Sequence, residues 1–438
     1  MGVFFGTDGI RGKVNEELTQ DVAYKIGNAL SILKNNPTIV IGADTRISNT
    51  YLALSVASGA MSGGANVIDI GVCPTAGIAY ITKEIKADYG VVISASHNSG
   101  EYNGIKVFDS NGYKLGEKEE ERIERCFIRS KVNEYPHIGR YEQNFNLVKL
   151  YRDYLIGASK NSLKGKTIVL DGAYGAAHKI APEVFRRLGA NVIAANCTNN
   201  GTKINEGCGA LYPENLVKRV FRYNADVGFA FDGDSDRLMA VDEKGNVING
   251  DEIIYGLAKY LKAKGELRSN IVVGTSHTNM AIEDGLKAEG IDMIRTDIGD
   301  KYVLAKLVEK NLSLGGEQSG HIILKDLATT GDGILSAIVV ANMLVEQNKA
   351  MSEAFGVKLY PQSNKNVIVE DKFRVMNSEE LSKEVVKYNA ELAGKGRLMI
   401  RASGTEPKIR VMVESKDHEL NETIAKAIVN TIKGISAK

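Results

Sequence analysis

The sequence lacks tryptophan and has only 7 prolines and 4 cysteines among its 438 residues. Cys73, Cys126, Cys197 and Cys208 lie far apart without Cys-x-x-Cys spacing, which predicts neither a disulfide framework nor a zinc site. No run of 18 apolar residues is present, so a transmembrane helix is excluded. The N-terminal residues MGVFFGTDGIRG lack the basic and apolar segments of a leader. We therefore expect a cytoplasmic protein with no membrane partner.

The chain also lacks an excess of either charge. Lys and Arg total 55 and Asp and Glu total 54, which gives a formal net charge of +1, so nothing in the balance favours nucleic acid as a partner. The hydrophobic share of 43% and the charged share of 25% are typical of globular proteins. At about 150 residues per domain, the length predicts about three domains. Glycine is abundant, with 45 residues, which predicts many tight turns.

A two-part unit recurs three times along the chain. Its first part is a β-branched strand that ends in a small or polar loop: TIVIGADTR at 38–46, TIVLDGAYGA at 167–176 and NIVVGTSHTN at 270–279. Its second part is another strand with a loop: ADYGVVISASHN at 87–98, ADVGFAFDGDSDR at 225–237 and NLSLGGEQSGH at 311–321. Strands that alternate with helices predict α/β layers rich in parallel strands, whose ligands bind at strand ends. We therefore expect the loops to lie near one site.

Beyond about residue 365 the pattern changes to a small α+β unit. We expect helices at about 378–392 and 417–433, with the strands GRLMIRASG and KIRVMVES between them. The predicted domains are 1–148, 149–250, 251–364 and 365–438. The charged run from Lys114 to Arg125 predicts a solvated helix without a functional role.

The strongest single motif is FDGDSDR, which follows the apolar strand VGFAF. Asp232, Asp234 and Asp236 alternate in this loop, and three unpaired carboxylates would repel one another unless they shared a cation. Mg²⁺ is favoured over Zn²⁺ because all these ligands are oxygens. An acidic surface turn is the alternative, and an EF-hand is disfavoured because the spacing does not fit.

A second motif, ISASHNSGEYNGIKVF at 93–108, occupies the equivalent loop of the first unit. Adjacent serine and histidine alone are weak evidence, and a serine hydrolase would require a Gly-x-Ser-x-Gly elbow, which is absent. Because the next unit carries the aspartates at the same place, we expect Ser96 to face a metal ion.

Two further loops carry polar side chains suited to a sugar phosphate. In the C-terminal unit, two arginines, two hydroxyls and a glycine fit a phosphate dianion: Arg401, Arg410, Ser403, Thr405 and Gly404. The third unit offers three residues suited to hydroxyl or amino groups: Glu317, Ser319 and His321. Together with the serine and the metal loop, these features predict phosphoryl transfer on a small polyol phosphate.

Five motifs in this order, FGTDGIRG, ISASHN, DGDSDR, GEQSGH and RASGTEPKIRVM, span the chain from end to end. With them the sequence resembles the α-D-phosphohexomutases, and ISASHN and the glutamine of GEQSGH resemble the phosphoglucosamine mutase branch. The resemblance implies three similar α/β domains with mixed, parallel-rich sheets and a C-terminal α+β domain around a central cleft. These domains would carry, in order, a phosphoserine loop, a metal loop, a sugar loop and a phosphate-binding loop.

The resemblance also implies a reaction. Ser96 would be the phosphoserine that carries the phosphoryl group, and with Asp232, Asp234 and Asp236 it would bind one Mg²⁺ per chain. Glucosamine 6-phosphate and glucosamine 1-phosphate would interconvert through a bisphosphorylated sugar, with a hexosamine or hexose 1,6-bisphosphate as primer. The implied partner is therefore a small sugar phosphate, and a homodimer is a further prediction.

The remaining site residues take their implied roles from the same resemblance. Five orient phosphate or handle protons: Arg11, His97, Lys106, Arg237 and His321. Lys106 is the first candidate for a general base, provided that burial or nearby cations lower its pKa. Glu317 and Ser319 hold sugar hydroxyls, and Gln318 reads the substituent at position 2. The non-reacting phosphate is held by Arg401, Ser403, Gly404, Thr405 and Arg410.

Other readings stay open on the sequence. The stretch EYNGIKV looks more like the phosphomannomutase and phosphoglucomutase branch, so glucose or mannose phosphates are alternative substrates. A metal-dependent sugar phosphatase would differ only in using water as the acceptor, and a sugar-phosphate-binding regulator would lack turnover. Ser99 stands where the family often has proline, which predicts a less restrained loop.

Overall fold

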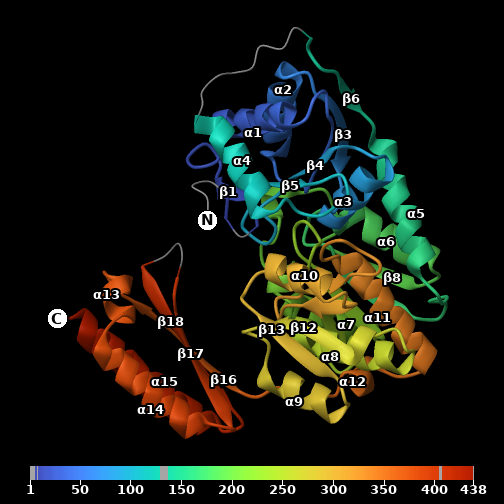
Figure 1. Ribbon diagram of the computed structural model, residues 1–438. Helices are drawn as coiled ribbons and strands as arrows, with labels where there is room; N and C mark the ends of the chain where they lie inside the picture. The colour runs from blue at the N-terminus through green and yellow to red at the C-terminus, as the bar shows by residue number, and fades with distance from the viewer. Residues whose placement is uncertain (1–4, 7, 129–136, 404–406, 438) are drawn as a thin grey trace. The chain divides into compact units, whose positions relative to one another are not determined.

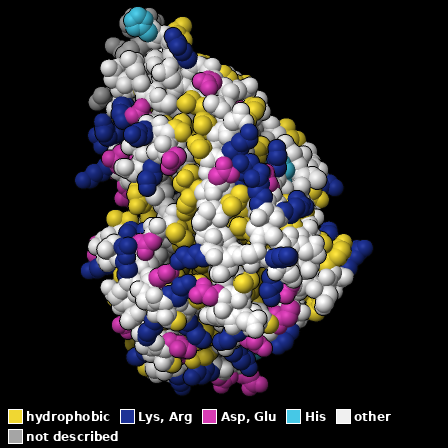
Figure 2. Space-filling view, turned by 90° about the vertical axis from the view of Figure 1, so that its right-hand side faces the viewer, with side chains coloured by type: hydrophobic (Ala, Val, Ile, Leu, Met, Phe, Trp, Pro, Cys, Tyr) yellow, Lys and Arg dark blue, Asp and Glu magenta, His cyan; other side chains and the backbone are white. Residues whose placement is uncertain are grey.

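The computed structural model describes residues 5–6, 8–128, 137–403 and 407–437. The chain divides into two compact units, of which unit 1 is Met1–Thr278 with Leu286–Gly356 and unit 2 is Asn279–Gly285 with Val357–Lys438. Across the described residues, no helix is both long and apolar enough to cross a membrane. Lys and Arg are interspersed with Asp and Glu on the face shown in Figure 2, as the charge balance predicts.

The first sheet of unit 1 contains six strands. Their bounds are β1 Ile10–Lys13, β2 Thr38–Ala43, β3 Asn66–Val72, β4 Tyr89–Ile93, β5 Tyr102–Phe108 and β6 Tyr141–Gln143, in the order β1-β5-β4-β2-β3-β6. The helices of this region are α1 Gln20–Leu33, α2 Asn49–Ser62, α3 Thr75–Glu84 and α4 Glu117–Ile128. Helix α1 begins after Thr19, whose side chain accepts a hydrogen bond from the backbone N–H of Val22.

The second and third sheets of unit 1 are shorter. The second comprises β7 Thr167–Asp171, β8 Asn191–Ala195, β9 Val227–Phe231, β10 Leu238–Asp242 and β11 Val247–Ile248, in the order β11-β10-β9-β7-β8. The third comprises β12 Ile271–Thr275, β13 Asp292–Thr296, β14 Leu314–Gly316 and β15 Ile322–Leu324, in the order β13-β12-β14-β15. Helices in this part of the chain are α5 Val148–Ala158, α6 Ala177–Arg187, α7 Glu214–Tyr223, α8 Gly250–Ala263, α9 Met280–Ala288, α10 Asp300–Glu309, α11 Gly333–Gln347 and α12 Met351–Ala354 (Figure 1).

The three sheets share one topology, which confirms the repeat seen in the sequence. In each sheet, one central strand lies between two parallel neighbours. Strand β2 lies between β3 and β4, β7 lies between β8 and β9, and β12 lies between β13 and β14. The strand after each second neighbour returns antiparallel to it, as β5, β10 and β15 do. Each second loop of the repeat therefore connects a parallel strand to an antiparallel one.

Unit 2 contains the α+β structure expected at the C-terminus. Its sheet has the antiparallel order β16-β18-β17, with bounds β16 Gln362–Ile368, β17 Gly396–Ala402 and β18 Lys408–Ser415. Its helices are α13 Lys372–Met376, α14 Glu379–Leu392 and α15 His418–Ser436, and α14 and α15 pack against the sheet. The predicted fold class of parallel-rich α/β domains followed by an α+β domain is thus confirmed.

Candidate active site

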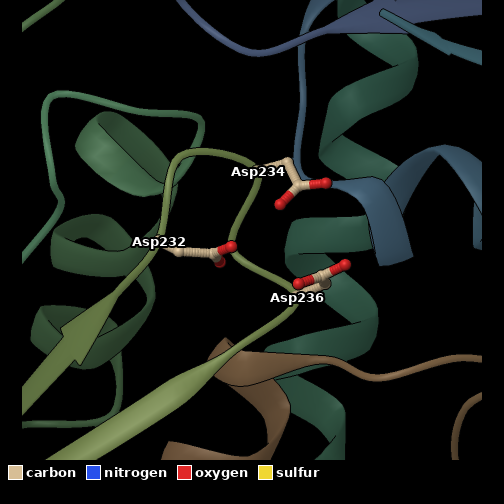
Figure 3. Close-up of side chains that lie close together, drawn as sticks. All are labelled: Asp232, Asp234 and Asp236. Carbon is tan, nitrogen blue, oxygen red and sulfur yellow. The ribbon is translucent and has the colours of Figure 1, made fainter. Parts of the chain in front are cut away.

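The aspartate loop follows β9, all five of whose residues are buried. Asp232, Asp234 and Asp236 are also buried, and one carboxylate oxygen of each lies within 4.8 Å of the others. Figure 3 shows the three side chains along this loop. Among the described residues, Asp234 Oδ1 and Asp236 Oδ1 have no hydrogen-bond partner. Buried oxygens without donors are costly unless a cation or a ligand satisfies them. The loop therefore has the donor set and the unmet charge of a hard-cation site.

The three carboxyl groups differ in their surroundings. Burial, together with the neighbouring Asp236 and Asp234, holds the pKa of Asp232 well above its ordinary value. Burial would also raise the pKa of Asp236, but the nearby Lys106 and His321 outweigh it and hold that pKa well below its ordinary value. A cation bound among the three would favour the charged form of each.

Ser96 lies directly against this loop. Its Oγ donates a hydrogen bond of 2.6 Å to Asp232 Oδ2, and its backbone adopts the left-handed conformation with φ 51°. Ser94 supports it from behind, since the Ser94 Oγ accepts the Ser96 N–H at 2.9 Å and donates to Asp44 Oδ2 at 2.6 Å. Loops 136 residues apart in the chain thus place a hydroxyl beside the metal ligands.

Gly233 allows the close approach of these two loops. A Cβ atom at this position would lie 2.5 Å from the carbonyl oxygen of Ser96, well inside van der Waals contact. Any larger residue would force the serine loop away from the aspartates.

Lys106 does not have the environment that a general base requires. Its Nζ lies 2.9 Å from Asp234, 2.9 Å from Asp8 and 3.3 Å from Asp236. Although burial lowers its pKa, these carboxylates outweigh burial and hold the pKa well above its ordinary value. The prediction of a base depended on a lowered pKa, and the structure gives the opposite. Lys106 is instead a buried cation that pairs with three carboxylates and offsets part of their charge.

His97 is the neighbour of Ser96 in this loop, and its Nδ1 lies 3.4 Å from the Ser96 Oγ. Burial, together with the charges of Arg237 and Arg11, lowers its pKa to about 4. The imidazole is therefore neutral at neutral pH, where it can act as a weak base.

The two arginines of the predicted site border the same loops. Arg11 donates to Asn98 Oδ1 at 3.1 Å, and the Nε of Arg237 lies 3.9 Å from Asp236 Oδ1. Among the described residues, the Nε atoms of Arg11 and Arg237 are buried without a hydrogen-bond partner. Both guanidinium groups thus retain donor capacity for an anion.

The sugar loop borders a cavity of about 400 Å³. The residues that line it are Met239, Asn249, Thr275, His277, Ile298, Glu317, Gln318 and Ser319. Glu317 Oε1 accepts the backbone N–H of Gly299 at 3.1 Å, and within the described chain the buried Oγ of Ser319 has no partner. His277, to which the sequence gave no role, therefore lies with the three predicted sugar-binding residues.

His321 joins the sugar loop to the metal loop. Its Nδ1 lies 3.6 Å from Asp236 and its Nε2 lies 3.5 Å from Asp300. Burial lowers its pKa, but Asp236 and Asp300 raise it above the ordinary value. The backbones of the two loops also pair, through a bridge between Arg237 and His321.

Sequence reasoning missed a buried ion-pair network beside this site. Lys114 was expected on a solvated helix, but its side chain is only 13% exposed and pairs with Asp8 at 2.5 Å and with Asp300. The helix itself starts later, at Glu117. Thr75 was also missed, and its Oγ donates to Asp234 Oδ2 at 2.7 Å. Asp8 could have been proposed as a site residue from the sequence, because it belongs to the motif FGTDGIRG.

The predicted phosphate-binding residues lie in unit 2. Arg401 on β17 and Arg410 on β18 are register partners, and both are exposed. Burial, and after it the charge of Arg410, lowers the pKa of Arg401. Ser403 is buried, whereas Gly404 and Thr405 lie outside the described residues. Facing like charges are unfavourable in a sheet, and the two arginines place positive charge side by side on β17 and β18.

Family models of the phosphoglucomutase/phosphomannomutase α/β/α domains match residues 2–134 (domain I), 149–245 (domain II) and 249–360 (domain III). The model of the C-terminal domain of the same family matches residues 365–431. The chain belongs to the phosphoglucomutase/phosphomannomutase family, and is therefore an enzyme of the phosphohexomutase type.

Within this family, the chain is similar to proteins named phosphoglucosamine mutase. The phosphoglucosamine mutase of Caldanaerobacter subterraneus subsp. tengcongensis is 44% identical over 99% of both chains. That of Carboxydothermus hydrogenoformans is 44% identical over 99% of this chain and 100% of its own. A phosphoglucomutase/phosphomannomutase family protein from Burkholderia thailandensis has the same fold, with a TM-score of 0.83, 21% identity and coverage of 98% and 97%. The resemblance to the phosphoglucosamine mutase branch is thereby confirmed.

Proposed function

We propose that this chain interconverts glucosamine 6-phosphate and glucosamine 1-phosphate through a phosphorylated Ser96. The observation that carries the proposal is the 2.6 Å hydrogen bond between Ser96 Oγ and Asp232 in a buried cluster of three carboxylates. The 44% identity to proteins named phosphoglucosamine mutase supports the amino sugar as substrate.

The three aspartates fit a divalent cation, and we propose Mg²⁺ because every ligand in the cluster is an oxygen. Asp234 Oδ1 and Asp236 Oδ1 supply buried acceptors that lack a donor in the described residues. When bound, the ion would neutralise negative charge that develops on the serine oxygen as the phosphoryl group leaves.

In the first half-reaction, the bond between phosphorus and Ser96 Oγ breaks as a bond forms to the free hydroxyl of the sugar. His97, whose Nδ1 lies 3.4 Å from Ser96 Oγ, takes the proton of that hydroxyl and passes it to the serine oxygen as the phosphoryl group leaves. Arg11 and Arg237 orient the phosphoryl oxygens, and Lys106 offsets the charge of the carboxylates around it. The second half returns the other phosphate to Ser96, so no phosphate is consumed overall.

The sugar is bound along the third loop in this proposal. Glu317 accepts hydrogen bonds from ring hydroxyls, and Ser319 donates hydrogen bonds to them. Gln318 lines the same cavity of about 400 Å³ and binds the substituent at position 2. Arg401, Ser403 and Arg410 hold the non-reacting phosphate, with Gly404 and Thr405 assigned to the same role. Hexosamine or hexose 1,6-bisphosphate would prime the unphosphorylated serine.

We also propose that the enzyme acts in the cytoplasm. The cysteines are free thiols, as a reducing cytoplasm would keep them, and phosphorylated sugars are charged and do not cross a bilayer unaided. A homodimer stays a prediction, which sedimentation velocity tests directly.

The deciding experiment compares kcat/KM for glucosamine 6-phosphate, glucose 6-phosphate and mannose 6-phosphate with Mg²⁺ and a bisphosphate primer, while sugar 1-phosphates and free phosphate are followed together. The value of kcat/KM should be highest for glucosamine 6-phosphate. Ser96→Ala should abolish turnover without abolishing sugar-phosphate binding. A preference for glucose or mannose phosphate would assign the chain to the other mutase branch. Free phosphate without any 1-phosphate would instead identify a phosphatase.

A further inference from the structure

Two side chains from different parts of unit 1 grip the loop that carries Ser96. Arg46 follows β2 of the first sheet, and Asn205 lies in the loop between β8 and α7 of the second. Both donate hydrogen bonds to the same two backbone oxygens. Arg46 Nη2 lies 2.9 Å from the oxygen of Ser96 and 2.8 Å from that of Asn98. Asn205 Nδ2 lies 2.9 Å and 3.0 Å from these two oxygens.

Arg46 uses its whole guanidinium group in this contact. Its Nε donates to Asp44 Oδ2 at 2.9 Å, and its side chain is 0% exposed. Its remaining four donors point to the backbone oxygens of Ser96, Asn98, Ser99 and Tyr102. A lysine has three donors on a single atom and cannot reproduce this planar fork. The side chain is thus specific for one conformation of the loop.

Asn205 connects the same loop to the sheet that carries the aspartates. Its backbone N–H donates to the oxygen of Ala173 at 3.0 Å, and Ala173 follows β7, a direct neighbour of β9 in the second sheet. The aspartate loop begins where β9 ends. The serine loop and the metal loop are therefore fixed to one frame, although they come from different sheets.

The loop needs this support for two reasons. Ser96 holds a left-handed backbone with φ 51°, which is unfavourable for a residue with a side chain. In addition, Ser99 supplies no φ restraint of the kind that a proline would.

We propose that Arg46 and Asn205 are positioning residues that clamp the Ser96 loop, so that the serine oxygen stays against the aspartates through both phosphoryl transfers. This inference rests on the proposed function, since it concerns the group that Ser96 carries. Neither residue reaches the serine oxygen itself, so both act through the backbone.

The test uses Asn205→Asp, which keeps the size of the side chain but removes the donor, and Arg46→Lys, which keeps the charge. Asn199→Asp is the matched control, because Asn199 is exposed in the same connection. Single-turnover phosphorylation of Ser96 by glucose 1,6-bisphosphate is followed by mass spectrometry, alongside kcat, KM and hydrogen exchange of the peptide 94–103. A misplacement of about 1 Å can cost about 100-fold in rate, so kcat and the phosphorylation rate should fall by about that factor in Asn205→Asp while KM changes little.

Faster hydrogen exchange in peptide 94–103 of both clamp variants, but not of Asn199→Asp, supports the clamp. If Arg46→Lys fails to fold, Asn205→Asp alone decides the matter. The clamp is overturned if Asn205→Asp keeps the parent kcat and exchange, or if its loss lies wholly in KM. A parent protein that neither gains phosphate on Ser96 nor turns over sugar phosphate refutes the proposed function instead, and the clamp inference with it.

Discussion

Replacement of Gly233 by alanine tests how closely the serine and aspartate loops must approach. The new Cβ would lie 2.5 Å from the Ser96 oxygen, 2.9 Å from Ile204 Cδ1 and 3.0 Å from Asn205 Nδ2, whereas ordinary contact begins at 3.4 Å. The Ser96 oxygen is held by Arg46 and Asn205, so the two loops must separate by up to about 0.9 Å. Because a displacement of about 1 Å can cost about 100-fold, kcat for Gly233→Ala should fall by roughly that factor.

The stability of Gly233→Ala is the second half of this test. Overpacking of a buried site costs about 1–3 kcal/mol of the free energy of unfolding. Urea unfolding resolves a loss of this size, and most of the variant should still be folded without urea. Gly157→Ala is the control, since its Cβ would meet nothing within 4 Å. That glycine lies in α5, where alanine should add up to about 1 kcal/mol and leave kcat unchanged. A Gly233→Ala enzyme with the parent kcat would refute the argument that this contact sets the distance between the loops.

Two further predictions concern charge. Burial raises the pKa of Asp332 from its ordinary 3.8 to about 6, so the folded protein retains a proton that the unfolded chain loses between these values. The contribution of Asp332 to the free energy of unfolding should therefore fall by about 2 kcal/mol as the pH rises from 4 to 6. Asp332→Asn should remove this fall in urea titrations at several pH values, and equal slopes in both proteins would contradict the assignment. In unit 2, Arg410→Ala should raise KM for every phosphosugar about 10-fold or more, as loss of a charge-assisted contact does, without destabilising the fold. Unchanged affinity by calorimetry would exclude Arg410 from phosphate binding.

The loops of the candidate site could be predicted because they follow strands. Apolar runs such as VGFAF identify buried strands, and parallel strands place their following loops at one edge of the sheet. The polar letters of ISASHN and FDGDSDR then stand out against that background. The structure places Ser96 and Asp232 in contact as this reasoning anticipates.

The supporting residues could not be found in this way. Arg46 lies 50 residues and Asn205 lies 109 residues from Ser96 in the chain, and both bind backbone oxygens. Every residue has a backbone oxygen, so the sequence does not show which one a side chain binds. Lys114 belongs to a run of charged residues and is not distinguished from them by its sequence context. Its partner Asp300 lies 186 residues away in the chain. Buried charges that pair over long separations are decided by tertiary structure, which local periodicity does not encode.

The antiparallel return of β5, β10 and β15 after each site loop also fixes which side chains of the returning strand face the site. The side chains of a strand alternate between faces, so a shift of one residue in its pairing register moves every side chain of the strand to the other face. In β5, Lys106 reaches the aspartates, while Ile105 and Val107 pack in the core. A shift of one residue in the register of β5 against β1 and β4 would exchange them, burying the lysine in the core and withdrawing it from the carboxylates. The pairing of β5 with β1 and β4 therefore does more than build the sheet, because its register decides whether the lysine meets the carboxylates or the core.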